Sequence, residues 1–220
     1  MKKLLMLSLL IVLVMAVAAF AGLSGTPHQL ISGGEICVAC HTPHGAVSSS
    51  VGPLWNRSQA SQTYSPLYNS ATFNMGPTAT PGAQSLACLT CHNGVASTLV
   101  NGSGPGVGNA ALYAINAAGT SGGIDNYSYA NPFANIGLDL SNDHPIGFLY
   151  NAAADLQGNN FPTAVNGVIA SVYPLYAGNM ECATCHDVHN VANPGRDPVY
   201  FLRASNAASA LCTACHTTKL

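Results

Sequence analysis

The chain has 220 residues, enough for one ordinary domain, and only 6% of them are charged. Its formal net charge is −2, and six basic residues are too few to form a basic nucleic-acid-binding surface. An average soluble domain has roughly 25% charged residues. We therefore expect the surface to be covered either by uncharged polar side chains or by further copies of the chain.

The N-terminus has the pattern of a secretory signal peptide. An apolar run extends from Leu4 to Phe20 with Ser8 as its one polar residue, and it ends in small residues up to Ala21. This pattern predicts a signal peptide over residues 1–21, with an uncleaved anchor as the alternative. Residues 22–220 then form the exported domain, and loss of the two N-terminal lysines leaves it with a net charge of −4.

All eight cysteines fall in four CxxCH motifs, in which a histidine directly follows the second cysteine. The two cysteines can hold the vinyl groups of one haem as thioethers, and the histidine can bind its iron. Disulfides or zinc sites would not require that histidine in every motif. We therefore predict four covalently bound c-type haems. The thioether residues are Cys37, Cys40, Cys88, Cys91, Cys182, Cys185, Cys212 and Cys215, and the proximal iron ligands are His41, His92, His186 and His216.

The histidines outside these positions number four, which equals the number of sixth iron positions to be filled. Methionine is the other common axial ligand. Only Met75 and Met180 remain after signal removal, and both are predicted to be packing residues. We predict that every iron has two histidine ligands, and that the distal ligands are His28, His44, His144 and His189.

Two motifs carry a second histidine three residues after the first: His44 follows His41, and His189 follows His186. Residues three apart on a helix have Cβ atoms only about 5–6 Å apart and face the same way. The two axial ligands of one iron approach from opposite sides. The second histidine must therefore bind the iron of a neighbouring haem, and the spacing CxxCHxxH predicts closely packed haems.

Residues 93–181 contain no attachment motif. Within them, Pro145 favours an extended backbone at His144, which suits a ligand presented by a loop. We expect loops over residues 101–123, a short strand pair near 127–129, and a short helix from a cap at Ser205.

Each half of the chain begins with a CxxCHxxH motif and later carries a plain CxxCH, which suggests a duplication. Aliphatic residues are scattered rather than arranged in stripes. We therefore predict a multihaem cytochrome c fold of coil, short helices and little sheet, with the core built around four haems.

The motifs together resemble the tetrahaem members of the multihaem cytochrome c family, and most of all the extracellular cytochromes that polymerise into nanowire filaments. The resemblance implies electron transport and a homopolymer in which a histidine near the N-terminus ligates the last haem of the adjacent subunit. His44 is the first candidate for that role, and His28 is the second. The segments that carry the resemblance are His28, CVACHTPHGA (37–46), PLWNR (53–57), CLTCHNG (88–94), NDHPIGF (142–148), ECATCHDVHN (181–190) and LCTACH (211–216).

Three functions compete. A filament would conduct electrons between the cell and external donors or acceptors. A monomeric periplasmic shuttle, or the cytochrome subunit of a respiratory complex, would normally need a charged docking face. An enzyme would need an open iron, whereas the histidines suffice to close all four. We predict the filament, located outside the cell or on its surface, with no membrane span after signal removal, no nucleic-acid partner, and redox proteins or external acceptors as partners.

Overall fold

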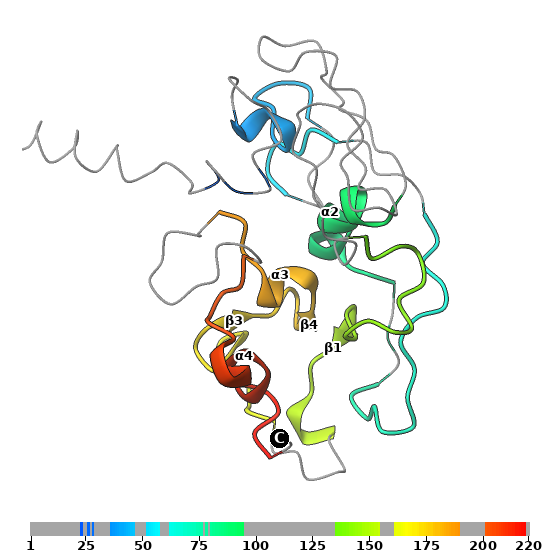
Figure 1. Cartoon of the computed structure of the whole chain (residues 1–220), viewed down its shortest axis with the longest axis vertical. Helices are drawn as coiled ribbons and strands as arrows, with labels where there is room; N and C mark the ends of the chain where they lie inside the picture. The colour runs from blue at the N-terminus through cyan, green and yellow to red at the C-terminus, as the bar shows by residue number, and fades with distance from the viewer. Residues whose placement is uncertain are drawn as a thin grey trace, which may run out of the picture.

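The computed structural model describes residues 23, 26, 28, 36–46, 52–57, 62–76, 78, 80–94, 135–154, 161–189 and 201–218. The predicted signal peptide and the strand pair expected near 127–129 lie outside these residues. The described part consists of short helices and very short strands joined by long stretches of coil, as predicted (Figure 1). No helix in this part is long and apolar enough to cross a membrane.

Each CxxC segment forms or contains a helical turn, which brings its two cysteines to the same side of the backbone. The single helix predicted from a cap at Ser205 is wrong in detail, because a kink at Ala208 divides the segment into η4, whose N-cap is Asn206, and α4, whose N-cap is Ser209. The Ser205 hydroxyl does accept a hydrogen bond of 3.1 Å from the Ala207 N–H. The helical elements of the described residues are η1 (Ile36–Ala39), α2 (Ala83–His92), η3 (Ala152–Ala154), α3 (Cys182–Cys185), η4 (Ala207–Ser209) and α4 (Ala210–Thr213).

The strands of the described ranges form two antiparallel pairs. In the first, β1 (Phe148–Leu149) pairs with β4 (Asn179–Met180), and Phe148 lies opposite Met180. In the second, β2 (Val168–Ile169) pairs with β3 (Tyr173–Pro174). The turn between β2 and β3 places two residues at positive φ, as in the mirror-image turns that match the twist of a hairpin.

The part of the chain that the structure describes contains two small apolar clusters. Figure 1 shows η1 and α2 on one side of the molecule and the strands, α3 and α4 on the other. The first cluster contains Tyr64, Leu89 and Leu140 around α2. The second contains Phe148, Ile169, Tyr173 and Met180, with residues of α4 packed against it.

The two methionines expected to be packing residues have that role. Met180 is 5% exposed and belongs to the second cluster, and Met75 packs against the same cluster. Each apolar cluster thus lies beside an attachment motif, with α2 at the first and α4 at the second.

Candidate haem-binding site

The first CxxCHxxH motif is held by a backbone pairing with the segment that contains PLWNR. His41 forms an antiparallel bridge with Trp55. The Thr42 N–H donates to the Leu54 carbonyl and the Asn56 N–H donates to the Cys40 carbonyl, each at 2.8 Å. Leu54 has a positive φ of 58°, which turns the chain back towards the motif.

The second CxxCHxxH motif repeats this arrangement. His186 forms an antiparallel bridge with Leu202. The Asp187 N–H donates to the Phe201 carbonyl at 2.7 Å, and the Arg203 N–H donates to the Cys185 carbonyl at 2.8 Å. Phe201 has a φ of 54°, close to that of its counterpart in the first motif.

An arginine closes each of these loops onto the backbone of its own motif. Arg57 is fully buried, and its Nε donates to the Ala39 carbonyl at 2.8 Å. Arg203 donates from Nε to the Ala183 carbonyl at the same distance, and it also pairs with Asp187 at 3.1 Å. The duplication suggested by the motif order is therefore visible in the local backbone, whereas the two arginines are offset by one position, because Arg203 is the counterpart of Asn56.

Three pairs of histidine rings face each other, and each pair joins one CxxCH histidine to one predicted distal ligand. Two imidazoles that bind one metal from opposite sides, with metal–nitrogen bonds of about 2.0–2.1 Å, would have ring centres roughly 6 Å apart. The three observed separations match this value. They are 6.0 Å for His28 and His92, 5.8 Å for His41 and His189, and 6.5 Å for His144 and His216.

His189 lies opposite His41, so the second histidine of the third motif faces the first motif and not its own. The ring of His41 is oriented by its Nδ1, which lies 2.7 Å from the Pro53 carbonyl oxygen. Such a second partner fixes the tautomer and leaves Nε2 to bind a metal. The ring of Trp55 packs against His41 at 6.1 Å in an edge-on arrangement.

His28 is placed by a short turn and by an aromatic contact. The Thr26 hydroxyl donates to the Leu23 carbonyl at 2.6 Å and accepts from the His28 N–H at 3.3 Å. The edge of Phe201 packs on the ring of His28 at 4.4 Å. Burial, with smaller contributions from nearby histidines, lowers the pKa of His28 to about 3, which keeps its imidazole in the neutral, metal-binding form.

His144 lies in a loop, as the adjacent proline predicts, and its Nδ1 is 3.0 Å from the Pro145 carbonyl oxygen. On the other side of this pair, the ring of Phe161 packs against His216 at 5.0 Å. The remaining two histidines of the inventory, His44 and His186, are both exposed. The Thr42 hydroxyl donates to the His44 carbonyl at 3.0 Å and holds the turn that contains it.

Successive attachment motifs are close enough in space for their thiols to change one another's pKa. Burial raises the pKa of Cys40 to about 11, Arg57 opposes this, and Cys91 of the second motif adds to it. The pKa of Cys88 is raised well above its usual value, first by its hydrogen bond to Cys182 of the third motif and then by burial.

The third and fourth motifs are neighbours in the same way. Burial raises the pKa of the Cys185 thiol to about 11, and the nearby Cys215 thiol raises it further. The first motif thus lies beside the second, the second beside the third, and the third beside the fourth. Cofactors attached at these positions would follow one another along a continuous path.

The donor groups fit covalently bound haem. All eight cysteines carry free thiols. Among the described residues, no three His, Cys, Asp or Glu side chains converge on a common point for a directly bound metal ion. In addition, the buried Nε1 of Trp55 has no hydrogen-bond acceptor within the described residues, and a haem propionate beside His41 would supply one.

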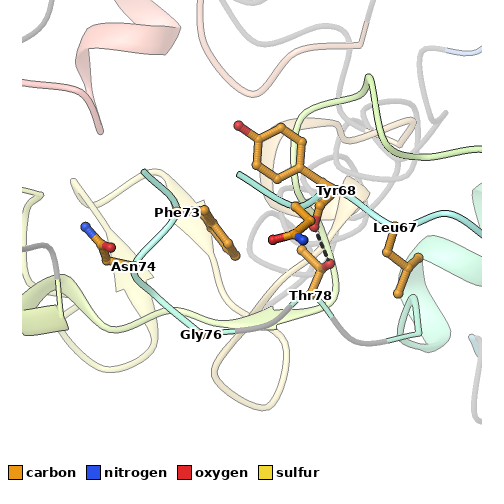
Figure 2. A pocket seen from close by; sticks show the side chains of 7 residues that line it. Leu67, Tyr68, Phe73, Asn74, Gly76 and Thr78 are labelled. Atoms are coloured by element: carbon orange, nitrogen blue, oxygen red, sulfur yellow. Dashed lines mark hydrogen bonds between the residues drawn. The ribbon is translucent and has the colours of Figure 1, made fainter. Parts of the chain in front are cut away.

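A separate cavity of about 640 Å³ lies in the stretch from Leu67 to Thr78 (Figure 2). Within its lining, the Thr78 hydroxyl donates to the Tyr68 carbonyl at 2.7 Å. Phe73 lies edge-on to both Tyr68 and Phe148, at 5.7 and 4.9 Å, and connects the cavity to the second apolar cluster. None of the predicted haem ligands lines it.

Residues 174–220 match the family model described as a doubled CXXCH motif. The matched region contains the third and fourth motifs, and the match indicates a multihaem c-type cytochrome with covalently bound haem and a role in electron transport. No curated protein matches the chain.

Sequence reasoning did not single out Glu181, Ser85 or Arg57. Each is buried and holds an attachment motif through hydrogen bonds. Arg57 and Glu181 lie within segments that were quoted for the family resemblance, but a polar residue beside a motif is not by itself a signal of burial. Arg57 lies in the PLWNR segment, and its role becomes apparent only when that segment is seen to pair with the first motif.

Proposed function

We propose that this protein is an exported electron-transfer cytochrome with four bis-histidine c-type haems. The observation that carries the proposal is the set of three opposed histidine pairs, each with the separation expected for two ligands of one metal. When bound, the haems would supply one-electron chemistry at iron, at potentials lower than those of His/Met haems. Two imidazoles per iron leave no position for a substrate, which favours electron transfer over catalysis.

Successive attachment motifs are neighbours in space, which supports a continuous path for electrons. Helices α2 and α3, which carry the second and third motifs, pack against each other. The Cys215 thiol of the fourth motif is close enough to Cys185 of the third to raise its pKa. His189 ties the third motif back to the iron of the first. An electron that enters at any motif therefore has a near neighbour to move to.

Polymerisation into an extracellular filament is the finer part of the proposal. The pairing of His28 with His92 favours a role for His28 within its own chain. The pairing of His144 with His216 likewise favours His144 as the ligand, within its own chain, of the fourth iron. These pairs, together with that of His41 and His189, provide for three of the four proposed irons. We therefore assign the fourth distal ligand, His44, to the iron held by His186. In a filament this would be the third haem of the adjacent copy, rather than the last haem that the family resemblance implied.

The low charge of the exported domain supports this arrangement, because surfaces buried between copies need few charges. Export itself rests on the N-terminal sequence. N-terminal sequencing of the exported protein is expected to begin at Gly22, and a sequence that begins at Met1 would contradict removal of the signal peptide.

A monomeric periplasmic electron shuttle is the second candidate, and one observation favours it. The two CxxCHxxH motifs have the same local fold, and His189 reaches the other half of its own chain. By this equivalence, His44 would reach the iron held by His186 within the same chain. The two candidates therefore share a ligand assignment and differ only in which copy provides His44.

Dilution separates the two candidates, because ligation between copies depends on concentration and ligation within a chain does not. If a neighbour provides His44, dilution of the purified protein shortens the filaments and converts one low-spin iron per chain to high spin. If His44 acts within its own chain, the spectrum is the same at all concentrations and electron micrographs show single particles.

The variant His44→Ala completes the test. In a filament it keeps all four haems and abolishes polymerisation, whereas the matched variant His189→Ala opens an iron and leaves the filaments intact. Normal filaments of His44→Ala with an unchanged low-spin spectrum would reject the proposed contact. A pyridine haemochrome assay that finds fewer than four haems per chain would reject the cytochrome proposal itself.

A further inference from the structure

Helices α2 and α3 are joined by a buried polar contact, which we name the α2–α3 junction and which consists of Gly82, Ser85, Glu181 and Cys182. The Gly82 N–H donates to both carboxylate oxygens of Glu181, at 3.2 and 3.1 Å. The Ser85 hydroxyl also donates to this carboxylate. In turn, Ser85 Oγ accepts a hydrogen bond of 2.9 Å from the Cys182 N–H.

The junction replaces the cap that α2 lacks. The helix begins after Gly82, which has no side chain to accept a hydrogen bond from the first turn. Glu181, which is 99 residues further along the chain, provides the missing acceptor and places a carboxylate at the positive end of the helix dipole. A Cβ at position 82 would collide with Oε1 of Glu181, so a larger residue here would have to displace this carboxylate from its contact.

The α2–α3 junction is deeply buried, and its hydrogen bonds restrict its geometry. Glu181 is 3% exposed and Ser85 is fully buried. A buried carboxylate is costly unless donors surround it, and this one has donors from the backbone of α2 and from Ser85. The contact therefore allows little freedom in how α2 and α3 lie against each other.

The same two helices carry the second and third attachment motifs. Ser85 lies one helical turn before Cys88, and Glu181 directly precedes Cys182. Helices α2 and α3 also pack directly against each other. The second motif is the last of the first half of the chain, and the third is the first of the second half. The α2–α3 junction therefore holds the two halves together at the point where their attachment sites meet.

We propose that Glu181 and Ser85 are positioning residues that set the distance and orientation between the second and third haems, and so govern electron transfer between the two halves of the protein. This inference rests on the proposed haem loading. Neither residue is an iron ligand or a thioether residue. They act through α2 and α3, whose cysteines hold the two cofactors.

The test compares three variants of the full-length, haem-loaded protein. Glu181→Ala removes the acceptor for both donors of α2, Ser85→Ala removes the bridge to Cys182, and Glu181→Gln keeps an oxygen acceptor of nearly the same shape. Asp139→Asn is the matched control, because this exposed carboxylate also accepts from a serine but lies outside the junction.

The readout is the exciton couplet in the Soret circular dichroism, which reports the distance and angle between neighbouring haems. The couplet is expected to be reduced in Glu181→Ala and Ser85→Ala, largely retained in Glu181→Gln, and unchanged in the control. Electron transfer along the chain after rapid reduction is expected to slow in the same two variants.

A parent-like couplet in both Glu181→Ala and Ser85→Ala would overturn the positioning role. If Glu181→Ala is not obtained in haem-loaded form, the positioning role is tested with Ser85→Ala alone. This variant leaves the contact between Glu181 and Gly82 in place. Haem content and spin state are measured on the same samples. A deficit of haem in the parent would contradict the proposed function, whereas full loading with an unaltered couplet contradicts only the inference about the junction.

Discussion

Replacement of His189 by alanine is expected to open the iron held by His41, although His189 belongs to the third motif. The two rings lie 5.8 Å apart with 36° between their planes. This separation matches ligands on opposite sides of one metal, with bonds of about 2.0–2.1 Å. Alanine ends at Cβ and cannot reach the iron, so one of the four proposed irons loses its sixth ligand.

Carbon monoxide provides the assay, because it binds ferrous haem only where a coordination position is open. The reduced parent is expected to bind none, and His189→Ala is expected to bind one molecule per chain. The double variant His44→Ala, His189→Ala is expected to bind two, since these histidines serve different irons.

The identity of the opened iron is tested by removal of the first haem through Cys37→Ser and Cys40→Ser. In that background, His189→Ala should add no carbon monoxide binding, because its iron is absent. Binding of one molecule per chain in that background would show that His189 serves another iron. Absence of binding in the single variant would refute the pairing of His189 with His41.

Three further predictions concern the fourth iron, the junction and the first apolar cluster. The rings of His144 and His216 cross at 75°, so their iron is expected to give the highly anisotropic low-spin electron paramagnetic resonance signal of near-perpendicular imidazoles. Gly82→Ala is expected to lower the free energy of unfolding by about 1–3 kcal/mol, because the new Cβ collides with Glu181. Leu89→Ala, at a fully buried position, is expected to lower it by about 2–5 kcal/mol.

Both stability changes are measured by denaturant titration, with the fluorescence of the single tryptophan, Trp55, as the signal. Gly52→Ala and Leu149→Ala are the controls. A Cβ at Gly52 has no neighbour within 4 Å, and Leu149 is 60% exposed. Equal losses of unfolding free energy in a variant and its control would contradict the packing argument.

The anisotropic low-spin electron paramagnetic resonance signal is expected to be lost in His144→Ala. Persistence of the signal in this variant would assign it to another iron.

The chemistry of the site can be predicted from the sequence because the residues that bind each haem are close together in the chain. A CxxCH motif contains the thioether residues and the proximal ligand within five positions. The separation of three residues between His186 and His189 excludes their binding to opposite sides of the same iron, because even an extended chain spans only about 3.3–3.6 Å per residue. The helical spacing assumed for this pair is not present, since α3 ends at Cys185 and His186 is extended. Coil with short helices follows from scattered apolar residues, and the described part of the chain has this character.

The pairing of ligands could not be predicted in the same way, because it depends on contacts between distant parts of the chain. Nothing near His28 in the sequence points to His92 rather than to another motif. The contact between Gly82 and Glu181 is of the same kind, since it joins residues 99 positions apart. A glycine before a helix and a glutamate before a motif are each unremarkable until the fold brings them together.

The brevity of the helices has a consequence for how the protein is made in the cell. The longest helix described, α2, has ten residues, and isolated helices shorter than about 12–15 residues are only marginally stable in water. The chain is therefore expected to stay largely unfolded until its cofactors are attached. Biosynthesis would follow one order, with export first, ligation second and folding last. The yield would then be limited by the supply of haem and of the ligation enzymes, and surplus polypeptide would be degraded by proteases.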